Sequence, residues 1–200
     1  MTTFRHVFLE FIKPLSVFFG RLKIAHPHKV NANDYRKIIA VLQPGMVFLS
    51  RIDLELSDEF IPGFWMHSAL YAGNEKVLEA VGAGVIETDL IDFLLTKDFV
   101  CVLDPTFATT EQKQKAILTA RAVLGSPYDY LFESNSPHAF YCSELITFAF
   151  EQAIAPSLSP FTYADVLGGK TVSPQSFFDN PAIFALVLQT GGGKRSLAAA

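Results

Sequence analysis

One cysteine stands where a helix is expected to begin, and it is the residue best placed to act as a nucleophile. Cys142 follows an irregular segment that contains Pro127 and Pro137, and it opens a stretch whose apolar residues recur at helical spacing. Unpaired N–H groups and the helix dipole stabilise a thiolate at such a position, and a cysteine with a lowered pKa reacts at neutral pH. The sequence therefore predicts Cys142 as the candidate nucleophile. The alternative is a structural cysteine.

The second cysteine has a different setting. Cys101 lies in the apolar run 99–103, which predicts a buried strand, so we expect an inert core residue there. Two cysteines are too few for a disulfide framework or a cysteine-based zinc site. We therefore expect neither a metal nor a cofactor.

A nucleophilic cysteine needs a base, and the chain contains five histidines. His67 lies in the predicted strand 64–72, where a sheet would hold its ring in one orientation. His138 lies only four residues before Cys142, but in an irregular segment. The remaining three histidines lie in the N-terminal segment, at His6, His26 and His28. We predict His67 as the general base, with a half-buried structural histidine as the alternative.

Glu79 is the candidate for orienting that base. It lies on the predicted returning strand 77–81 of the same hairpin. Residues 67 and 79 share a face of the sheet only if the connecting loop has an odd number of residues. A loop over 73–75 with a glycine bulge would satisfy this condition. An even loop would place Glu79 on the opposite face as an ordinary solvent-facing residue.

The chain resembles a known family in several segments. LGSPYDYLF followed by YCSEL is similar to the cysteine motif of the NlpC/P60 superfamily, and the order His67, Glu79, Cys142 resembles its circularly permuted papain-like branch, the YiiX/YaeF-type proteins. Met46 departs from the aspartate that is more common at its position. The resemblance covers roughly residues 42–180, and its motifs lie at Pro44–Leu49, His67–Gly73, Val77–Ala80, Leu124–Phe132, Tyr141–Leu145 and Val172–Pro174.

The resemblance implies a cysteine hydrolase or transferase that acts on an amide or ester. Cys142 would attack a carbonyl carbon, His67 would carry the proton, and Glu79 would orient His67. The backbone N–H of Cys142 would stabilise the oxyanion, with the hydroxyl of Tyr128 as a second donor. The alternative for Tyr128 is a packed aromatic residue.

Two further residues are candidates for binding substrate. Glu144 lies in the first turn of the predicted helix, where a carboxylate is favoured, and it could act as a cap or contact a substrate amine. Trp65 lies close to His67 in sequence and could line a substrate cleft. Core packing is the alternative for Trp65.

The pattern of elements that must position these residues predicts an α+β fold. The resemblance specifies it as a permuted papain-like fold, in which an antiparallel sheet or barrel-like core packs against helices, with an additional N-terminal amphipathic helix. Short apolar runs bounded by turns predict strands, and a capping box at Thr109–Gln112 predicts a helix that ends near Gly125. The expected strands are 46–50, 64–72, 77–81, 85–87, 99–103 and 183–189.

Length and composition limit the functional classes. The chain has 200 residues, of which 18% are charged, and a net charge of −4. These values indicate one globular domain and argue against a disordered chain or a nucleic-acid partner. We expect an N-terminal helix and linker at 1–35, a catalytic domain at 36–190 and a flexible tail at 191–200.

The N-terminal segment is apolar on one helical face and carries four basic residues and one acidic residue between positions 5 and 23, a net charge of +3. It lacks a signal-peptide cleavage site, and no apolar run is long enough to span a membrane. We therefore expect a cytoplasmic protein. This helix either packs on the domain or lies on a membrane surface as a peripheral contact.

Three functions remain open at this stage. The first is a cysteine hydrolase that cleaves a peptide or isopeptide-like amide, of the cell-wall-peptide type, through a thioester. The second is a lipid-directed acyl hydrolase or acyltransferase, which resembles the lecithin:retinol acyltransferase group. The third is a non-catalytic binding module. The oligomeric state stays open.

Overall fold

A computed structural model describes residues 28–53, 63–130, 132, 138–155, 158–166 and 169–190, with the backbone alone described for 164–166 and 169–170. The expected N-terminal amphipathic helix and the tail 191–200 lie outside these residues. Among the described residues, no helix is both long and apolar enough to cross a bilayer.

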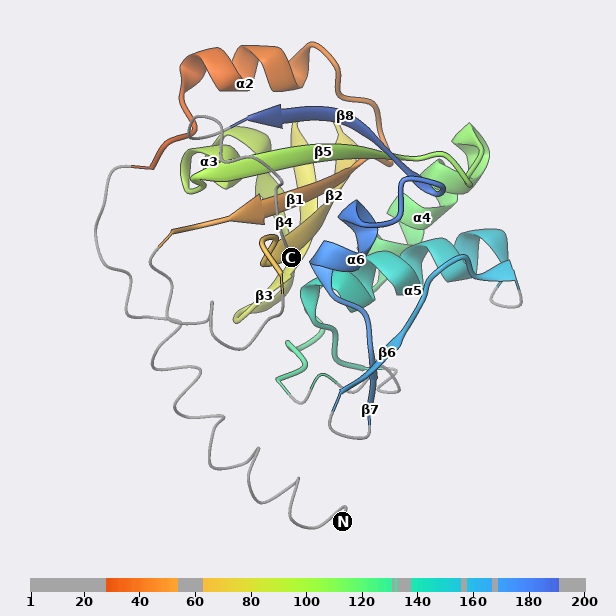
Figure 1. Ribbon diagram of the computed structural model, residues 1–200. Coiled ribbons are helices and arrows are strands. Elements are labelled where there is room, and N and C mark those ends of the chain that lie inside the picture. The colour runs from red at the N-terminus through yellow and green to blue at the C-terminus, as the bar shows by residue number, and fades with distance from the viewer. Residues whose placement is uncertain are drawn as a thin grey trace.

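The core of the molecule is one antiparallel sheet in the strand order β4-β3-β2-β1-β5-β8 (Figure 1). The sheet is open, with β4 and β8 at its edges, so the barrel-like closure that we considered does not occur. Helices cover both of its faces and bury its apolar side chains without closure. The strands are β1 (Val47–Arg51), β2 (His67–Gly73), β3 (Lys76–Val81), β4 (Gly84–Asp89), β5 (Phe99–Pro105) and β8 (Phe184–Thr190). A separate two-stranded sheet pairs β6 (Ala164–Val166) with β7 (Gly169–Thr171).

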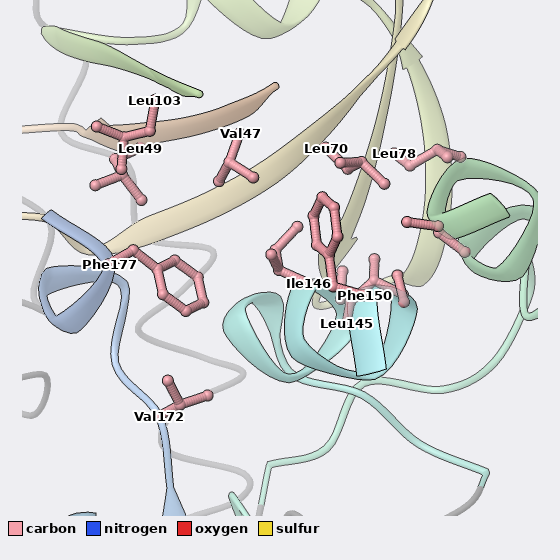
Figure 2. Packing of buried hydrophobic residues seen from close by; sticks show 14 of the residues in the cluster. Val47, Leu49, Leu70, Leu78, Leu103, Leu145, Ile146, Phe150, Val172 and Phe177 are labelled. Carbon is pink, nitrogen blue, oxygen red and sulfur yellow. The ribbon is translucent and has the colours of Figure 1, made fainter. Parts of the chain in front are cut away.

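Five helices pack against the large sheet in the described part of the chain. Helices α2 (Ala32–Ile39) and α3 (Leu90–Leu95) contribute to the apolar cluster on one face. Helices α4 (Thr110–Ala122), α5 (Cys142–Ile154) and α6 (Pro174–Phe178) contribute to the cluster on the other face. Figure 2 shows Leu145, Ile146 and Phe150 of α5 facing Leu70 and Leu78 of the sheet.

The six strands of the large sheet and helices α4 and α5 lie close to their predicted ranges, and the fold is the predicted mixture of helices and antiparallel sheet. Thr109 caps α4 as expected, because its side chain accepts the N–H of Gln112. Asp89 stands at the N-cap position of α3, but its carboxylate binds Lys76 at 2.5 Å and makes no cap hydrogen bond.

Helix α2 lies across the predicted domain boundary between residues 35 and 36. Ile38 is fully buried against the sheet, and the hydroxyl of Thr190 at the end of β8 donates to the Asp34 carboxylate. The helix therefore packs as part of the same core as the strands that follow it.

Candidate active site

The nucleophile candidate occupies the first position of helix α5. Tyr141 is the N-cap residue, and the Glu144 carboxylate accepts its N–H at 3.3 Å. Leu145 and Ile146, in the first turns of the helix, are buried against the sheet and hold this end of α5 in place. Cys142 is a free cysteine that is 4% exposed, at the helix end that stabilises an anion.

The β2–β3 hairpin has the odd connection that the prediction requires. Gly73 pairs with Lys76, so the turn has two residues in place of the expected loop 73–75, but five residues, 72–76, separate the paired Tyr71 and Val77. Asn74 and Glu75 form a turn with positive φ, and the register shifts between Tyr71 and Gly73. This bulge restores the parity that places residues 67 and 79 on one face.

The two polar residues lie where the hairpin strands cease to pair. The β2–β3 pairing ends at Leu70 and Leu78, although β2 still pairs with β1 at His67 opposite Ser50. The backbone N–H of Ser68, in the part of β2 that pairs with β1 but no longer with β3, donates to the Cys142 sulfur. The start of α5 therefore lies against β2 in the place that β3 has left.

His67 contacts both partners that the sequence assigned to it. Its Nε2 lies 2.8 Å from Oε2 of Glu79, and its ring also hydrogen-bonds the Cys142 sulfur. Because Nε2 is engaged by Glu79, Nδ1 is the ring nitrogen that faces the sulfur. The structure thus joins Cys142, His67 and Glu79 in one hydrogen-bonded chain, although 75 residues separate the first two in sequence.

The pKa values of these groups favour a charged pair. Burial by itself would raise the pKa of Cys142, but the hydrogen bond and charge of His67 lower it, and the N–H groups of Ser68 and Ser143 lower it further. Burial would likewise lower the pKa of His67, but Cys142 and Glu79 outweigh this effect and raise it to about 9. The arrangement therefore shifts the two pKa values in the directions that favour a thiolate beside an imidazolium.

Glu79 is held ionised by neighbours on three elements. Burial would raise its pKa, but His67 first, then a 2.7 Å hydrogen bond from Thr88 and the positive charge of Lys97, lower it to about 2. The Phe93 ring of α3 lies 6.3 Å from the His67 ring. Sequence reasoning did not select Thr88. The cross-strand pairing of Val77 with Thr88, which places Thr88 near Glu79, is visible only once the register is known.

Tyr128 lies close enough to the thiol for its pKa to respond to the thiolate charge. Burial is the main cause and the negative charge of Cys142 the next, and together they raise the pKa of Tyr128 well above 10. The phenol therefore stays protonated and keeps a hydrogen to donate. Tyr128 packs against the rings of Tyr130, at 4.9 Å, and Phe132, at 6.4 Å.

Glu144 is buried in the first turn of α5, outside the hydrogen-bonded chain from Cys142 to Glu79. It caps the Tyr141 N–H, as one of the two predicted roles requires. Burial raises its pKa to about 8, the Tyr141 N–H opposes this effect, and the charge of Asp129 adds to it.

Three other residues that the sequence analysis considered have different surroundings from those of Cys142. Trp65 has no exposed surface and packs between Phe64 and Phe178, which favours core packing over a role in lining a cleft. Cys101 is fully buried in β5, and burial raises its pKa to about 12, so the expected inert thiol is confirmed. His138 is exposed on the segment before α5.

Comparison with solved structures finds the same fold in a metalloprotein, yiiX, from Escherichia coli O157:H7. The two chains share 23% identity at a TM-score of 0.62, over 75% of this chain and 98% of the other. A comparison with curated proteins finds no match.

The description of that relative as a metalloprotein raises the question of a metal in this chain. Within the described ranges, no group of three or more His, Cys, Asp or Glu side chains is arranged to hold an ion. His67 lies between Cys142 and Glu79 and has each ring nitrogen engaged by one of them, so these three residues do not fit a metal site.

The family comparison covers the part of the chain that contains the three candidate site residues. Residues 41–187 match the model of the permuted papain-like amidases, which includes every residue of the hydrogen-bonded chain. The chain therefore belongs to the YaeF/YiiX family of permuted papain-like amidase enzymes, the C92 peptidase family.

Proposed function

We propose that this protein hydrolyses an amide bond through a thioester intermediate on Cys142. His67 acts as the base and then as the acid, and Glu79 orients His67. The observation that carries the proposal is the hydrogen-bonded chain from Cys142 through His67 to Glu79, with the lowered pKa of the thiol beside the raised pKa of the imidazole. Membership of an amidase family supports the same reaction.

In the first half-reaction the Cys142 thiolate attacks the substrate carbonyl carbon, and the carbonyl electrons move to oxygen. As the tetrahedral intermediate collapses, the C–N bond breaks and the His67 imidazolium gives its proton to the leaving amine. A thioester on Cys142 and a neutral His67 remain.

In the second half-reaction a water molecule attacks the thioester while His67 accepts one of its protons. The C–S bond then breaks, the acid product leaves, and the thiolate–imidazolium pair is restored. Glu79 keeps its negative charge throughout and holds the Nε2–H of His67, so the ring stays aligned for both proton transfers.

The oxyanion requires donors on the side of Cys142 that faces the substrate. The Cys142 backbone N–H lies in the first helical turn, where N–H groups have no partner within the helix. Tyr128 would add its hydroxyl as the second donor, which its proximity to the thiolate charge and its protonated state support.

We assign the substrate to the peptide or isopeptide-like amides, of the cell-wall-peptide type. The resemblance to the NlpC/P60 superfamily supports this class, and the thiolate pair suits the cleavage of an unactivated amide because the leaving amine can take the His67 proton. We assign Glu144 to capping α5, because its carboxylate is already engaged by the Tyr141 N–H.

The proposal is tested by incubating the full chain with a panel of peptidyl arylamides and isopeptides and recording both product release and the intact mass after acid quench. We expect turnover, and an acyl adduct on the peptide that contains Cys142. Cys101→Ala is the matched control and should behave as wild type. Turnover by Cys142→Ala at the wild-type rate would overturn the proposal, and the lack of any adduct or turnover across the panel would favour a binding module.

A lipid-directed acyl hydrolase or acyltransferase is the second candidate, and the apolar face and net charge of +3 of the N-terminal segment favour it. This function would include peripheral contact with a membrane. Phe8→Asp with Phe11→Asp in the full chain should then lower sedimentation with anionic vesicles and acyl transfer from them, while amide cleavage in solution stays unchanged. Equal sedimentation of both proteins would remove this candidate.

A further inference from the structure

We infer that Thr88 is a positioning residue of the active site, which holds the Glu79 carboxylate in the orientation that binds His67. The inference rests on the proposed roles of Cys142, His67 and Glu79. Thr88 Oγ1 donates to Oε1 of Glu79 at 2.7 Å, while Oε2 of the same carboxylate contacts His67 Nε2 at 2.8 Å. Each carboxylate oxygen therefore has its own protein partner.

The β3–β4 register places the hydroxyl beside Glu79. Val77 pairs with Thr88 and Glu79 pairs with Ile86, so Thr88 is the diagonal neighbour of Glu79 on the same face of the sheet. A threonine side chain has few accessible rotamers because it is branched at Cβ. The strand pairing and the stiff side chain thus fix the direction of the donated hydrogen.

The direction of this hydrogen bond follows from the chemistry of the two groups. An ionised carboxylate only accepts hydrogen bonds, so the Thr88 hydroxyl must be the donor. Glu79 is 5% exposed, and a buried carboxylate oxygen without a donor is costly. The Thr88 hydrogen bond satisfies Oε1 and leaves Oε2 directed at His67.

The other charged groups near this carboxylate do not replace Thr88. Lys97 lowers the pKa of Glu79 through its positive charge. On β4, Glu87 pairs with Arg121 at 2.9 Å and Asp89 pairs with Lys76 at 2.5 Å. Thr88 is thus the residue of β4 whose side chain donates a hydrogen bond to the Glu79 carboxylate.

The loss of the Thr88 hydroxyl should act on Cys142 through two intermediates. Oε1 of Glu79 would be left without a donor, and the carboxylate would turn away from the position that holds Nε2–H of His67. The imidazolium would be less stabilised, and the thiolate would then form only at higher pH. A change in the reactivity of the Cys142 thiol, transmitted through Glu79 and His67, would therefore show that Thr88 positions the site. A residue that only stabilised the fold would not produce this change.

The test measures the rate of alkylation by iodoacetamide as a function of pH, with the modified cysteine identified by mass spectrometry. For Thr88→Val we expect the rate at pH 6.5 to fall about tenfold and the acid limb of the profile to move to higher pH by about one unit. Thr88→Ser keeps the hydroxyl and should restore the wild-type profile. Thr119→Val on α4 is the matched control, because it removes a threonine hydroxyl that donates to the Lys115 carbonyl, away from Glu79.

A double-mutant cycle with Glu79→Gln identifies the route of the effect. If Thr88 acts through Glu79, Thr88→Val should add no further loss of alkylation rate in the Glu79→Gln background. A wild-type profile for Thr88→Val, or an equal loss in both backgrounds, would overturn the inference. If Thr88→Val does not fold, as judged by its thermal transition, Thr88→Ala is measured in the same way and is held to the same outcomes.

The alkylation measurement needs no substrate, so it separates this inference from the proposed function. A chain that cleaves no amide in the panel, yet whose Cys142 depends on Thr88 through Glu79, would retain the positioning role while the proposed reaction fails. A chain that cleaves amides with a Thr88-independent pH profile would do the reverse.

Discussion

The two cysteines of this protein lie in regions that differ in hydrogen bonding far more than in burial. Cys101, in the middle of β5, and Cys142, at the start of α5, are 0% and 4% exposed. Burial raises the pKa of Cys101 to about 12, whereas His67 and two backbone N–H groups hold the pKa of Cys142 below its usual value. Burial alone makes a thiol inert, and burial with a cation and donors makes it a nucleophile.

The two buried glutamates on either side of the site repeat this comparison. Glu79 and Glu144 are 5% and 6% exposed, but the pKa of Glu79 is lowered to about 2 and that of Glu144 is raised to about 8. Burial would raise the pKa of both acids, but His67, Thr88 and Lys97 outweigh it at Glu79. At Glu144 burial prevails, because the Tyr141 N–H opposes it only in part and the charge of Asp129 adds to it.

The test with the largest expected effect replaces each of the two cysteines by alanine. Cys142→Ala should reduce amide turnover by about a thousandfold or more, because no other group can form the thioester. Cys101→Ala should leave turnover near wild type and lower the free energy of unfolding by about 1–2 kcal/mol through the small cavity it creates. Comparable turnover of the two variants would show that the two environments have been assigned incorrectly.

The next test removes the cation that distinguishes the two thiols. His67→Ala should slow alkylation of Cys142 at pH 7 by about a hundredfold, because burial then raises the thiol pKa without an opposing charge. The rate should recover as the pH rises above 9. Alkylation that is unchanged at pH 7 would exclude His67 as the partner of the thiolate, whereas Cys101 should stay unlabelled in both proteins under native conditions.

Removing the charge of Glu79 should have a smaller effect, because this residue acts on the thiol only through His67. Glu79→Gln should lower turnover about thirtyfold and lower the pKa of His67 from about 9, since the carboxylate is one of the two groups that raise it. The alkaline limb of the pH–rate profile should therefore move to lower pH. A profile that coincides with that of wild type would separate Glu79 from the reaction.

The smallest effect concerns Glu144, and it appears in stability. Its folded-state pKa of about 8 lies above its unfolded value near 4.5, so the folded protein binds more protons between these values. The contribution of Glu144 to stability is therefore complete below pH 4.5 and is lost as the pH rises through 8. Wild type should lose more unfolding free energy than Glu144→Gln between pH 5 and pH 8, measured by urea denaturation. Parallel curves for the two proteins would contradict the raised pKa.

Local patterns were enough to predict much of the fold and the three candidate residues that the structure brings together, Cys142, His67 and Glu79. The helical spacing after Cys142 and the capping box at Thr109 each depend on neighbours only a few residues away, and the structure has both helices. The hairpin prediction for His67 and Glu79 used only the parity of a short connection, which the bulge at Gly73 satisfies. These features depend on interactions between residues that are close in sequence, so a short segment of the chain is enough to predict them.

Other features depended on contacts between segments that the sequence does not relate. The role of Thr88 requires the β3–β4 register, and the donation by the Ser68 N–H requires β3 to leave β2 where α5 begins. Trp65 has the side chain of a binding residue, and only its packing against Phe64 and Phe178 shows that it is buried. Asp89 is a good N-cap residue by type, but Lys76 of the neighbouring strand engages its carboxylate.

The amino-acid sequence by itself therefore determined which residues are candidates for the site: a cysteine at a helix start, a histidine on a strand, and a glutamate on the returning strand of the same hairpin, whose face depended on the length of the connection. The tertiary structure decided how far each group is ionised and which atoms meet. Ionisation depends on burial and on charges within a few ångströms, and folding brings such neighbours together from segments that lie far apart along the chain.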